Sequence, residues 1–589
     1  MGSGARYLDL LRTYVGPQWR RAVLLSVLLV ASIVLQLVNP QLLRYFIDNA
    51  ISGAEVDRLA LAALAFVIVA LVTQVLVAWS QYVGEDVGWT ATNALRADLA
   101  LHCLRLDLGF HKARTSGELI ERIDGDVTAL AAFFSRFVVN VLGNLALLLG
   151  VLVVVAREDL RAGVALSAFA AVAVLLMAGP LRNVAVRSWG VVREVSAQMY
   201  GFIGERLAGT EDIRSSGAEL HVMDGLTLHH RAWFAARRHA VLTGTVLWST
   251  TILTFAVGNA TAFGVGAYLW SIGAITLGTV YLLFHYTDML RRPIESMRRE
   301  LEDMQRAVAS VGRIDELLRT RSRLGAGAGA PLPDGPLAVE LDAVSFAYED
   351  SIQARDDLVL RDVTLRLAPG RVLGVLGRTG SGKTTLARLL LRFYDPKGGA
   401  IRLGGVDLRD AGLEDVRRRA TLVSQDVQLF HARVRDNLTF FDPTIDDARV
   451  LDVLERIGLD RWLRSLPRDA GHGPLDAEML AGGLSAGEAQ LLAFARVFVR
   501  DPGLVILDEA SSRLDPATER LIERAIDALL AGRTGIVIAH RLATLERCDE
   551  IVILEDGRIV EHGARIALAS DGSSRFARLL RTGLEQVLA

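Results

Sequence analysis

Residues 377–385 read Gly377-Arg378-Thr379-Gly380-Ser381-Gly382-Lys383-Thr384-Thr385, which is the glycine and lysine spacing of a phosphate-binding P-loop. An apolar run at 372–376 predicts a buried strand before the loop, and residues 384–391 predict a helix with one apolar face after it. Glycines allow backbone N–H groups to turn toward phosphate oxygens, and the helix N-terminus adds its positive dipole end. The sequence therefore predicts a strand, loop and helix that bind a nucleotide.

The polar side chains of this loop predict ATP and Mg²⁺ as ligands. Lys383 is expected to reach the β- and γ-phosphates, the Thr384 hydroxyl to bind Mg²⁺, and the Thr385 hydroxyl to contact a phosphate. Lysine occurs elsewhere only at Lys112 and Lys397, and arginine supplies all the other strongly basic side chains. A lysine at this position indicates a site that requires a compact charge rather than a guanidinium fork.

The composition predicts a membrane domain. The chain has 589 residues, of which 51% are hydrophobic, so it is too long for one domain and too apolar for an ordinary soluble protein. A net charge of −2 gives no basic footprint for nucleic acid, and the two cysteines match no metal or disulfide pattern. The apolar run after Arg21 has the length of a span and lacks the cleavage site of a signal peptide.

Six apolar stretches near the length of a bilayer precede residue 320. We predict spans at about 21–44, 59–83, 134–156, 162–181, 241–270 and 275–298, after a surface amphipathic helix at 7–15. The connections alternate between short ones and two long, arginine-rich ones, at 84–133 and 182–240. By the positive-inside rule, the long connections and both termini are expected in the cytoplasm, in a multi-pass protein of the cell membrane.

The second half of the chain has a different pattern. Residues 323–336 have the glycine and proline composition of a linker. From 337 to 589, short β-branched strands alternate with helices, which is typical of an α/β nucleotide-binding domain. We therefore predict a multidomain fold, with an all-α polytopic membrane domain at 1–322 followed by an α/β P-loop ATPase domain.

Further motifs follow the P-loop in a fixed order. Residues 504–509 form an apolar strand that ends in two carboxylates, which suits Asp508 for Mg²⁺ contact and Glu509 for polarising the attacking water. Residues 484–488 read Leu-Ser-Ala-Gly-Glu ahead of that strand. Gln425 follows a strand at 421–424, Asp515 follows the carboxylates, and His540 ends another strand.

This set of motifs resembles the ATP-binding cassette (ABC) family, and the layout resembles its exporter-type half-transporters, with six spans fused to one cassette. The resemblance covers essentially the whole chain and implies a helical subdomain in the cassette. It also implies roles for five residues: Tyr348 stacks on adenine, Gln425 joins Mg²⁺ to the membrane contact, Glu509 is the general base, His540 holds the γ-phosphate and water, and Asp515 reaches the partner cassette. Plain core for Tyr348 and a strand-end histidine for His540 remain alternatives.

The resemblance further implies a partner. In this family, two cassettes sandwich two ATP molecules. Each ATP site takes the P-loop of one chain and the signature motif of the other, which in this chain corresponds to residues 484–488. The chain is therefore expected to pair with a second half-transporter in a lipid bilayer, with ATP binding and hydrolysis driving alternating access. Segments near 109–127 and 205–219 resemble the two cytoplasmic coupling segments of the family.

The signature departs from the family pattern, which is usually Leu-Ser-Gly-Gly-Gln. Ser485 and Gly487 are retained, whereas Ala486 replaces a glycine and Glu488 the glutamine. Glu488 stands three residues after Ser485, which predicts a capping box that closes the helix N-terminus and sets a carboxylate near the incoming phosphate. Because Glu509 and the P-loop are of the competent type, this asymmetry predicts a heterodimer with unequal ATP sites. Simple drift between acceptable variants is the alternative.

Polar residues within the predicted spans are candidates for the substrate site. His285, Asp288 and Arg292 fall at i, i+3 and i+7, hence on one face of the sixth span, and Asn140 and Asn144 give the third span a polar face. Ionisable groups at such depth face a cavity or a partner. Substrate contact and an internal ion pair that fixes helix packing both remain open, and the residues do not separate lipid, drug, peptide and siderophore.

An ATP-driven exporter is the leading interpretation. An importer on the same architecture ranks second, because the cassette does not specify direction. A nucleotide-gated channel or regulator ranks third, since Glu509 and His540 argue for hydrolysis. The six predicted spans exclude a soluble cassette ATPase acting on DNA, and the lack of an acceptor-site signature excludes a kinase.

Overall fold

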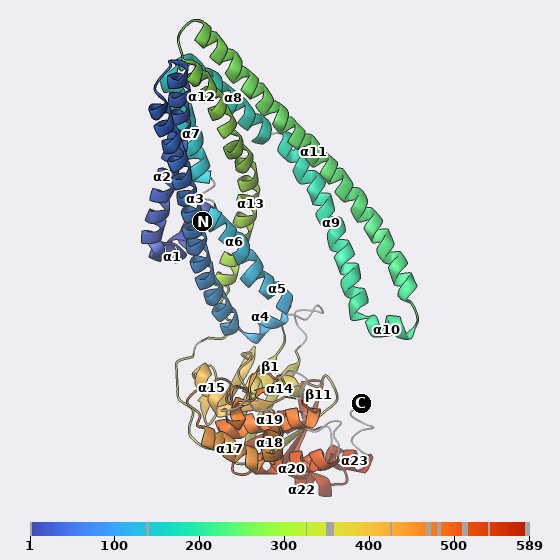
Figure 1. The fold of residues 1–589 in the computed structure, drawn as a ribbon. Coiled ribbons are helices and arrows are strands. Elements are labelled where there is room, and N and C mark those ends of the chain that lie inside the picture. Colours follow the sequence, from blue (N-terminus) through green and yellow to red (C-terminus); the bar gives the residue numbers. More distant parts are fainter. Residues whose placement is uncertain are drawn as a thin grey trace. The chain divides into compact units, whose positions relative to one another are not determined.

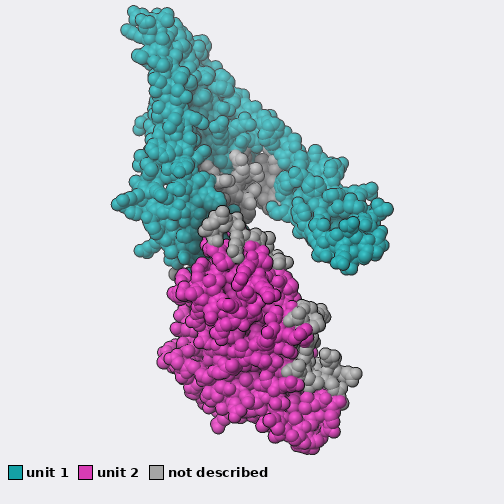
Figure 2. Space-filling view, turned by 60° about the horizontal axis from the view of Figure 1, so that its bottom comes forward, with its two compact units in different colours: residues 1–104, 116–320 teal, residues 105–115, 321–589 magenta. Residues whose placement is uncertain are grey.

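The computed structural model describes residues 3–136, 141–178, 180–325, 327–348, 358–424, 427–466, 473–479, 484–508, 516–539 and 542–582. The chain divides into two compact units, one of Met1–Leu104 and Ser116–Thr320 and the other of Arg105–Thr115 and Arg321–Ala589 (Figure 2). The second division lies close to the boundary predicted at 322. The segment 105–115, which the sequence placed in the membrane domain, belongs to the second unit.

The first unit is helical throughout its described length. Its helices are α1 Ser3–Tyr14, α2 Trp19–Ile51, α3 Val56–Arg105, α5 Ser116–Ile120, α6 Asp126–Arg136, α7 Gly143–Glu158, α8 Leu160–Ala178, α9 Pro180–Ala208, α10 Thr210–Ser215, α11 Glu219–Ser271, α12 Leu277–Met289 and α13 Arg291–Arg319. Short turns at Gly16–Gln18 and Glu121–Gly125 complete it. Figure 1 shows α9 and α11 running side by side as a long pair that α10 joins at one end.

Three of the described helical stretches are long and apolar enough to cross a bilayer, at Gly16–Ile51, Val56–Arg105 and Glu219–Ser271. A fourth, Leu160–Leu176, is apolar but shorter. The predicted spans at 134–156 and 275–298 each run through two helices, α6 with α7 and α12 with α13. The membrane domain is therefore helical as predicted, while the count of six spans stays a prediction.

The helices α3 and α11 continue well beyond the predicted spans. At 1.5 Å per residue, the 50 residues of α3 extend about 75 Å, more than twice the ~30 Å of a hydrocarbon core. The sequence predicted a span ending at 83 and then a long polar connection, but no proline interrupts residues 56–105 or 219–271. Because nothing breaks the hydrogen-bond ladder, each span and its polar extension form one helix.

The second unit contains two sheets and a short ribbon. A four-stranded antiparallel sheet has the order β2-β1-β4-β5, with β1 Val339–Phe346, β2 Leu360–Leu367, β4 Gly398–Leu403 and β5 Val406–Asp407. A six-stranded sheet has the order β12-β11-β3-β10-β9-β6, with β3 Val372–Leu376, β6 Ala420–Val423, β9 Leu504–Asp508, β10 Thr534–Ile538, β11 Glu550–Glu555 and β12 Arg558–Ala564. The ribbon pairs β7 Ala432–Arg433 with β8 Glu478–Met479.

The strands β11, β3, β10, β9 and β6 pair in parallel, and β12 is an antiparallel edge. The strands β3 and β10 are buried at every residue. Because both faces of such a parallel sheet are covered, the sequences of these strands are nearly continuous apolar runs. The parallel arrangement brings the carboxyl ends of β3, β10 and β9 to one edge, where such sheets bind their ligands. The α/β fold predicted for the second half is confirmed.

Helices cover these sheets and form the predicted helical part of the cassette. They are α14 Lys383–Leu390, α15 Leu413–Arg419, α16 Val434–Thr439, α17 Asp447–Arg456, α18 Asp460–Ser465, α19 Ala486–Arg500, α20 Pro516–Leu530, α21 Leu542–Leu545, α22 Arg565–Ser570 and α23 Arg575–Thr582. The remaining helix of this unit, α4 Leu108–Lys112, comes from the separate segment 105–115.

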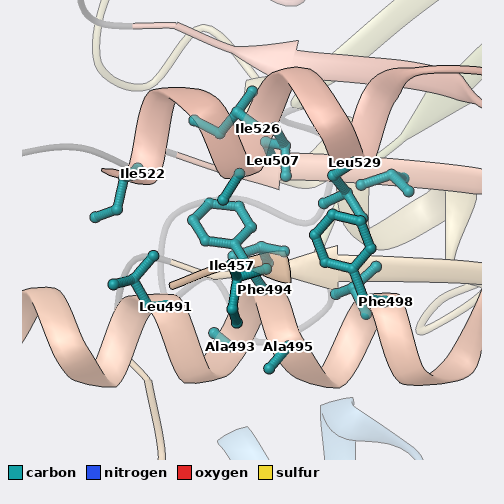
Figure 3. Close-up of a cluster of buried hydrophobic side chains, with 14 of the residues drawn as sticks. Ile457, Leu491, Ala493, Phe494, Ala495, Phe498, Leu507, Ile522, Ile526 and Leu529 are labelled. Carbon is teal, nitrogen blue, oxygen red and sulfur yellow. The ribbon is translucent and has the colours of Figure 1, made fainter. Parts of the chain in front are cut away.

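The core under α19 fixes the signature relative to the sheet. Figure 3 shows Phe494 and Phe498 of α19 directed toward Ile526 and Leu529 of α20, with Leu507 of β9 beside them. Leu507 is the residue before Asp508, and all five side chains are buried. Aromatic side chains contribute much of the buried apolar area in such a core. The helix that begins at the signature and the strand that ends at the carboxylates are therefore held by the same core.

Candidate functional site

The P-loop connects β3 to α14 as the sequence predicted. Gly377, Gly380 and Gly382 have φ values of 155°, 85° and 105°. A Cβ at Gly377 would lie 2.3 Å from the carbonyl oxygen of Leu554, and one at Gly382 would lie 2.6 Å from Cδ2 of Leu360. Glycine is required at both positions, because a side chain would clash and would disfavour this backbone conformation.

The side chains of the loop fit an anionic ligand. Lys383 is buried, and its Nζ donates to the carbonyl oxygens of Gly377 at 2.6 Å and Arg378 at 3.0 Å. The Oγ of Ser381 is buried and has no hydrogen-bond partner in the described part of the chain. A buried hydroxyl without a partner is costly, and a phosphate oxygen would satisfy it. Arg378, Thr379 and Thr384 are exposed at the mouth of the loop, where Thr384 can reach a cation.

The carboxylate predicted for Mg²⁺ lies at the same edge of the sheet. In β9, Asp508 pairs with Ile538 of β10, which in turn pairs with Val375 of β3. Asp508 therefore ends the second strand away from β3, at the same edge of the sheet as the P-loop, where its carboxylate can help to hold Mg²⁺. Four residues predicted for the ATP sites lie outside the described residues, namely Gln425, Glu509, Asp515 and His540. Their roles stay predictions.

Tyr348 is half-buried beside the P-loop helix. Its hydroxyl is 3.0 Å from Oγ1 of Thr385 and accepts from Nη1 of Arg388 at 3.3 Å. Its ring meets those of Phe346 and Tyr394 edge to face, at centroid distances of 4.9 and 5.2 Å. Tyr348 therefore belongs to an aromatic cluster and also bonds to the hydroxyl that is predicted to contact phosphate.

Lys112 had no predicted role, and the structure places it on Tyr348. Its Nζ lies 5.0 Å from the centroid of the Tyr348 ring, within the range of a cation–π contact. Lys112 is the last residue of α4, in the first predicted coupling segment. Its only signal in the sequence is that lysine is so rare in this chain.

Asp107 holds α4 in place. Its Oδ1 accepts from the N–H of Phe110 at 3.0 Å as the N-cap, and its Oδ2 accepts from the N–H of Arg323 at 2.9 Å. Burial raises the pKa of Asp107, but the two N–H groups and the charge of Arg323 outweigh it, so the pKa lies below its usual range. One ionised carboxylate thus joins α4 to the chain that leads into the cassette.

The capping box predicted at the signature is confirmed. Ser485 is the N-cap of α19, and its Oγ accepts from the N–H of Glu488 at 3.3 Å. Oε2 of Glu488 accepts from the Ser485 N–H at 2.9 Å and from the Ser485 hydroxyl at 2.8 Å. Ser485 and Ala486 are exposed, whereas Gly487 is buried. The carboxylate therefore lies at the positive end of α19.

In the first unit, the predicted polar residues of the sixth span line a hollow of about 970 Å³. His285, Asp288, Arg292 and Asn144 are all on its wall, whereas Asn140 lies outside the described residues. Asn144 donates to Oγ of Ser296 at 2.5 Å, and the His285 ring stacks on Tyr281. Among the described residues no ion pair joins Asp288 to Arg292, whereas an electrostatic attraction acts between Asp288 and His285. Substrate contact and an internal packing pair both stay predictions.

Four further polar residues that line the hollow were not predicted from the sequence. They are amide side chains of α2 and α3: Gln36, Asn39, Gln74 and Gln81. Their signal was available, because amides are rare within apolar stretches of membrane-spanning length. Length and average hydropathy identify a span but do not show which of its faces meets other helices.

The fold and site together define a P-loop ATPase domain joined to a helical membrane domain. The chain belongs to the ABC transporter family: residues 23–294 match the model of the ABC transporter transmembrane region, and residues 360–512 match that of the ABC transporter. It is 30% identical to the uncharacterized ABC transporter ATP-binding protein YknV of Bacillus subtilis, over 95% of this chain and 92% of that protein.

Two further similarities concern exporters. The chain is 32% identical to the multidrug efflux ATP-binding/permease protein Rv0194 of Mycobacterium tuberculosis, over 97% of this chain but only 47% of that protein. The solved structure of a bacterial Atm1-family ABC exporter with ATP bound is similar with a TM-score of 0.79 and 25% identity, and the match covers 96% of this chain and 98% of that one.

Membership of the family establishes ATP-driven transport, with ATP hydrolysis in the cassette and ATP and Mg²⁺ as its ligands. The exporter-type half-transporter predicted from the sequence is confirmed, and the importer alternative is not favoured. A half-transporter of this family assembles as a dimer in a lipid bilayer, as a multi-pass membrane protein.

Proposed function

We propose that this chain is one half of a heterodimeric exporter with two unequal ATP sites. Its own P-loop takes part in the hydrolysing site, and its altered signature covers a slow, ATP-retaining site on the partner. The observation that carries this proposal is the capping box between Ser485 and Glu488. We expect the partner to supply a standard signature and to lack a competent base of its own.

The capping box weakens the signature in two ways. The Ser485 hydroxyl donates to Glu488 and is therefore not available to a phosphate oxygen without breaking that bond. The Glu488 carboxylate also occupies the helix end whose dipole would otherwise attract the phosphate. In a homodimer both ATP molecules would meet this carboxylate, whereas in a heterodimer only one does.

The chain's own ATP site has the competent residue types. Lys383 exchanges its two carbonyl partners for phosphate oxygens, Ser381 and Thr385 donate to phosphate, and Tyr348 stacks on adenine. Thr384 and Asp508, with Gln425, hold Mg²⁺, which neutralises charge on the β- and γ-phosphates when it is bound. Glu509 polarises the attacking water as general base, and His540 holds that water and the γ-phosphate. Asp515 reaches the partner cassette.

The membrane part is proposed to export its cargo from the cytoplasm. The arginine-rich connections at 84–133 and 182–240 support a cytoplasmic location for both termini and for the cassette. The names of the exporter relatives support the direction. The segments near 109–127 and 205–219 couple the cassette to the spans, and the place of α4 within the second unit supports this role for the first of them.

The test is to express this chain alone and together with the product of the neighbouring reading frame, and to measure assembly and ATPase activity in proteoliposomes. We expect a stable, active complex only when both chains are present. A stable homodimer with full activity would refute the heterodimer. Uptake of cargo into inverted vesicles supports export, and uptake into right-side-out vesicles would refute it.

A further inference from the structure

The hollow in the first unit has the volume of a small-molecule site. Its ~970 Å³ lies at the upper end of the range of about 300–1,000 Å³ found for such pockets. Residues from α2, α3, α7, α12 and α13 line it, so the wall consists of helices rather than loops. A site built on helices positions its polar groups well, and the chemistry of those groups then indicates the cargo.

The wall carries two opposite charges, Asp288 and Arg292. Both are exposed on the hollow, and neither makes a hydrogen bond or a close ion pair within the described chain, although His285 attracts Asp288. They are four residues apart, on either side of the point where α12 ends and α13 begins. The adjacent pair differs, because Nε of Arg291 lies 3.2 Å from Oε1 of Glu295. The same segment can thus satisfy one acid and one base internally while it presents another acid and base to the hollow.

The part of the wall that α2 and α3 form can recognise amides. Gln36, Gln74 and Gln81 make no hydrogen bond among the described residues, so their donors and acceptors are available to a ligand. Oδ1 of Asn39 is buried and has no hydrogen-bond partner in the described structure. By contrast, the hydroxyls of Ser32, Thr73 and Ser80 donate to carbonyls of their own helices. An amide side chain pairs well with a peptide group, because each offers both a donor and an acceptor.

We propose that the cargo is a small zwitterion with amide groups, such as a peptide of two or three residues, whose amine meets Asp288 and whose carboxylate meets Arg292. The peptide groups bind the glutamine and asparagine side chains of α2 and α3. This inference rests on the proposed transport function, of which it specifies the cargo. A neutral lipid would leave both charges and four amides unsatisfied, and a lipophilic cation would leave Arg292 without a partner.

The test measures binding of labelled probes to the nucleotide-free transporter in proteoliposomes. Any partner chain that copurifies with the transporter is kept in the preparation. The probes are a labelled tripeptide mixture with free termini, the same mixture N-acetylated, the same mixture C-amidated, a lipophilic cation and a neutral lipid. Binding is measured without hydrolysis, so its result is separate from the result of the ATPase test of the proposed function. The variants are Asp288→Asn and Arg292→Gln, with Asp57→Asn and Arg58→Gln as controls, an exposed adjacent pair outside the hollow.

Each of the two charges predicts its own change in the binding preference for free over capped tripeptides. The free tripeptides should bind the wild type at least about tenfold tighter than either capped mixture, as expected for loss of a charge-assisted hydrogen bond. Asp288→Asn should remove the preference for a free amine and leave that for a free carboxylate, and Arg292→Gln should do the reverse. The control variants should bind as the wild type does.

Two results would overturn the proposal. One is tighter binding of the lipophilic cation or the lipid than of any tripeptide mixture. The other is unchanged binding in both hollow variants combined with lower thermal stability, which would mean that Asp288 and Arg292 pair with the partner half and fix its packing.

Discussion

Glu488→Gln is the substitution that most directly tests the role of the altered signature. In the structure, one carboxylate oxygen accepts from both the N–H and the hydroxyl of Ser485, at the N-terminus of α19. Glutamine has the same shape and keeps an oxygen that can accept one of these bonds, but it removes the charge. We therefore expect two effects of opposite sign, a loss of cassette stability and a gain in ATP affinity.

The loss of stability is small. A hydrogen bond to a charged acceptor contributes about 1 kcal/mol more than a neutral one, and the helix dipole adds about 0.3–1 kcal/mol. Because Ser485 is exposed, solvent screening keeps the total near 1 kcal/mol. The gain in affinity comes from the repulsion that disappears: two unit charges at about 4 Å interact by ~1 kcal/mol in water and ~4 kcal/mol at an effective dielectric constant of 20. Taking about 1–2 kcal/mol, we expect about 5–30-fold tighter ATP binding at the site that this signature covers.

The assay compares wild-type and Glu488→Gln complexes of the two chains. Labelled ATP that remains bound after rapid gel filtration measures affinity at the slow site, and thermal unfolding of the same preparation measures stability. Glu455→Gln is the matched control, because Glu455 is an exposed glutamate of α17. It should change neither quantity.

The reasoning fails if Glu488→Gln lowers stability without any change in ATP retention, since the carboxylate would then act only as a helix cap. It also fails if retention rises equally at two sites per complex, because the altered signature would then face both ATP molecules.

Three other substitutions test separate parts of the mechanism. Glu509→Gln should lower steady-state ATPase activity by about 10² or more with ATP still bound, as expected for loss of a general base; unchanged activity would show that another group activates the water. Lys112→Met removes a cation–π contact of about 0.5–1 kcal/mol; it should leave ATP binding intact and reduce the stimulation of ATPase activity by cargo. Lys397→Met, at an exposed lysine, is the control. Equal effects of the two substitutions would argue against coupling through Tyr348. Asp126→Asn weakens the hydrogen bonds that Ser310 and Arg313 donate to this buried carboxylate and should cost about 1–3 kcal/mol, seen as a lower unfolding temperature. An equal loss in Asp124→Asn, whose carboxylate is exposed beside Arg96, would contradict that estimate.

The P-loop and the capping box could be predicted because their signals are local. The glycines of residues 377–385 and the capping box at 485–488 depend on backbone geometry within a few residues, so the sequence shows them directly. The alternation of apolar strands and helices in the second half has the same local character, and it predicted the α/β class of this domain. The structure added the parallel pairing that brings Asp508 to the same edge of the sheet as the P-loop.

The membrane domain was harder to predict, because average hydropathy shows how apolar a stretch is but not where its helix ends or which face meets lipid. It located α2, α3 and α11 but limited the spans of α3 and α11 to 59–83 and 241–270, whereas the helices continue as polar extensions over 56–105 and 219–271. It also did not distinguish the face of α2 and α3 that carries the amides from the face that meets lipid, so Gln36 and Gln74 were missed although His285 and Asp288 were found.

The sequence by itself determined the family, the P-loop chemistry and the altered signature, because each rests on residues close together in the chain. Only the tertiary structure decided that Lys112 lies on Tyr348, more than two hundred positions further along the chain. It also decided that Asp288 and Arg292 line one hollow together with amides of α2 and α3. These contacts join segments that are remote in sequence. The packing of whole helices brings them together, and no local pattern encodes that packing.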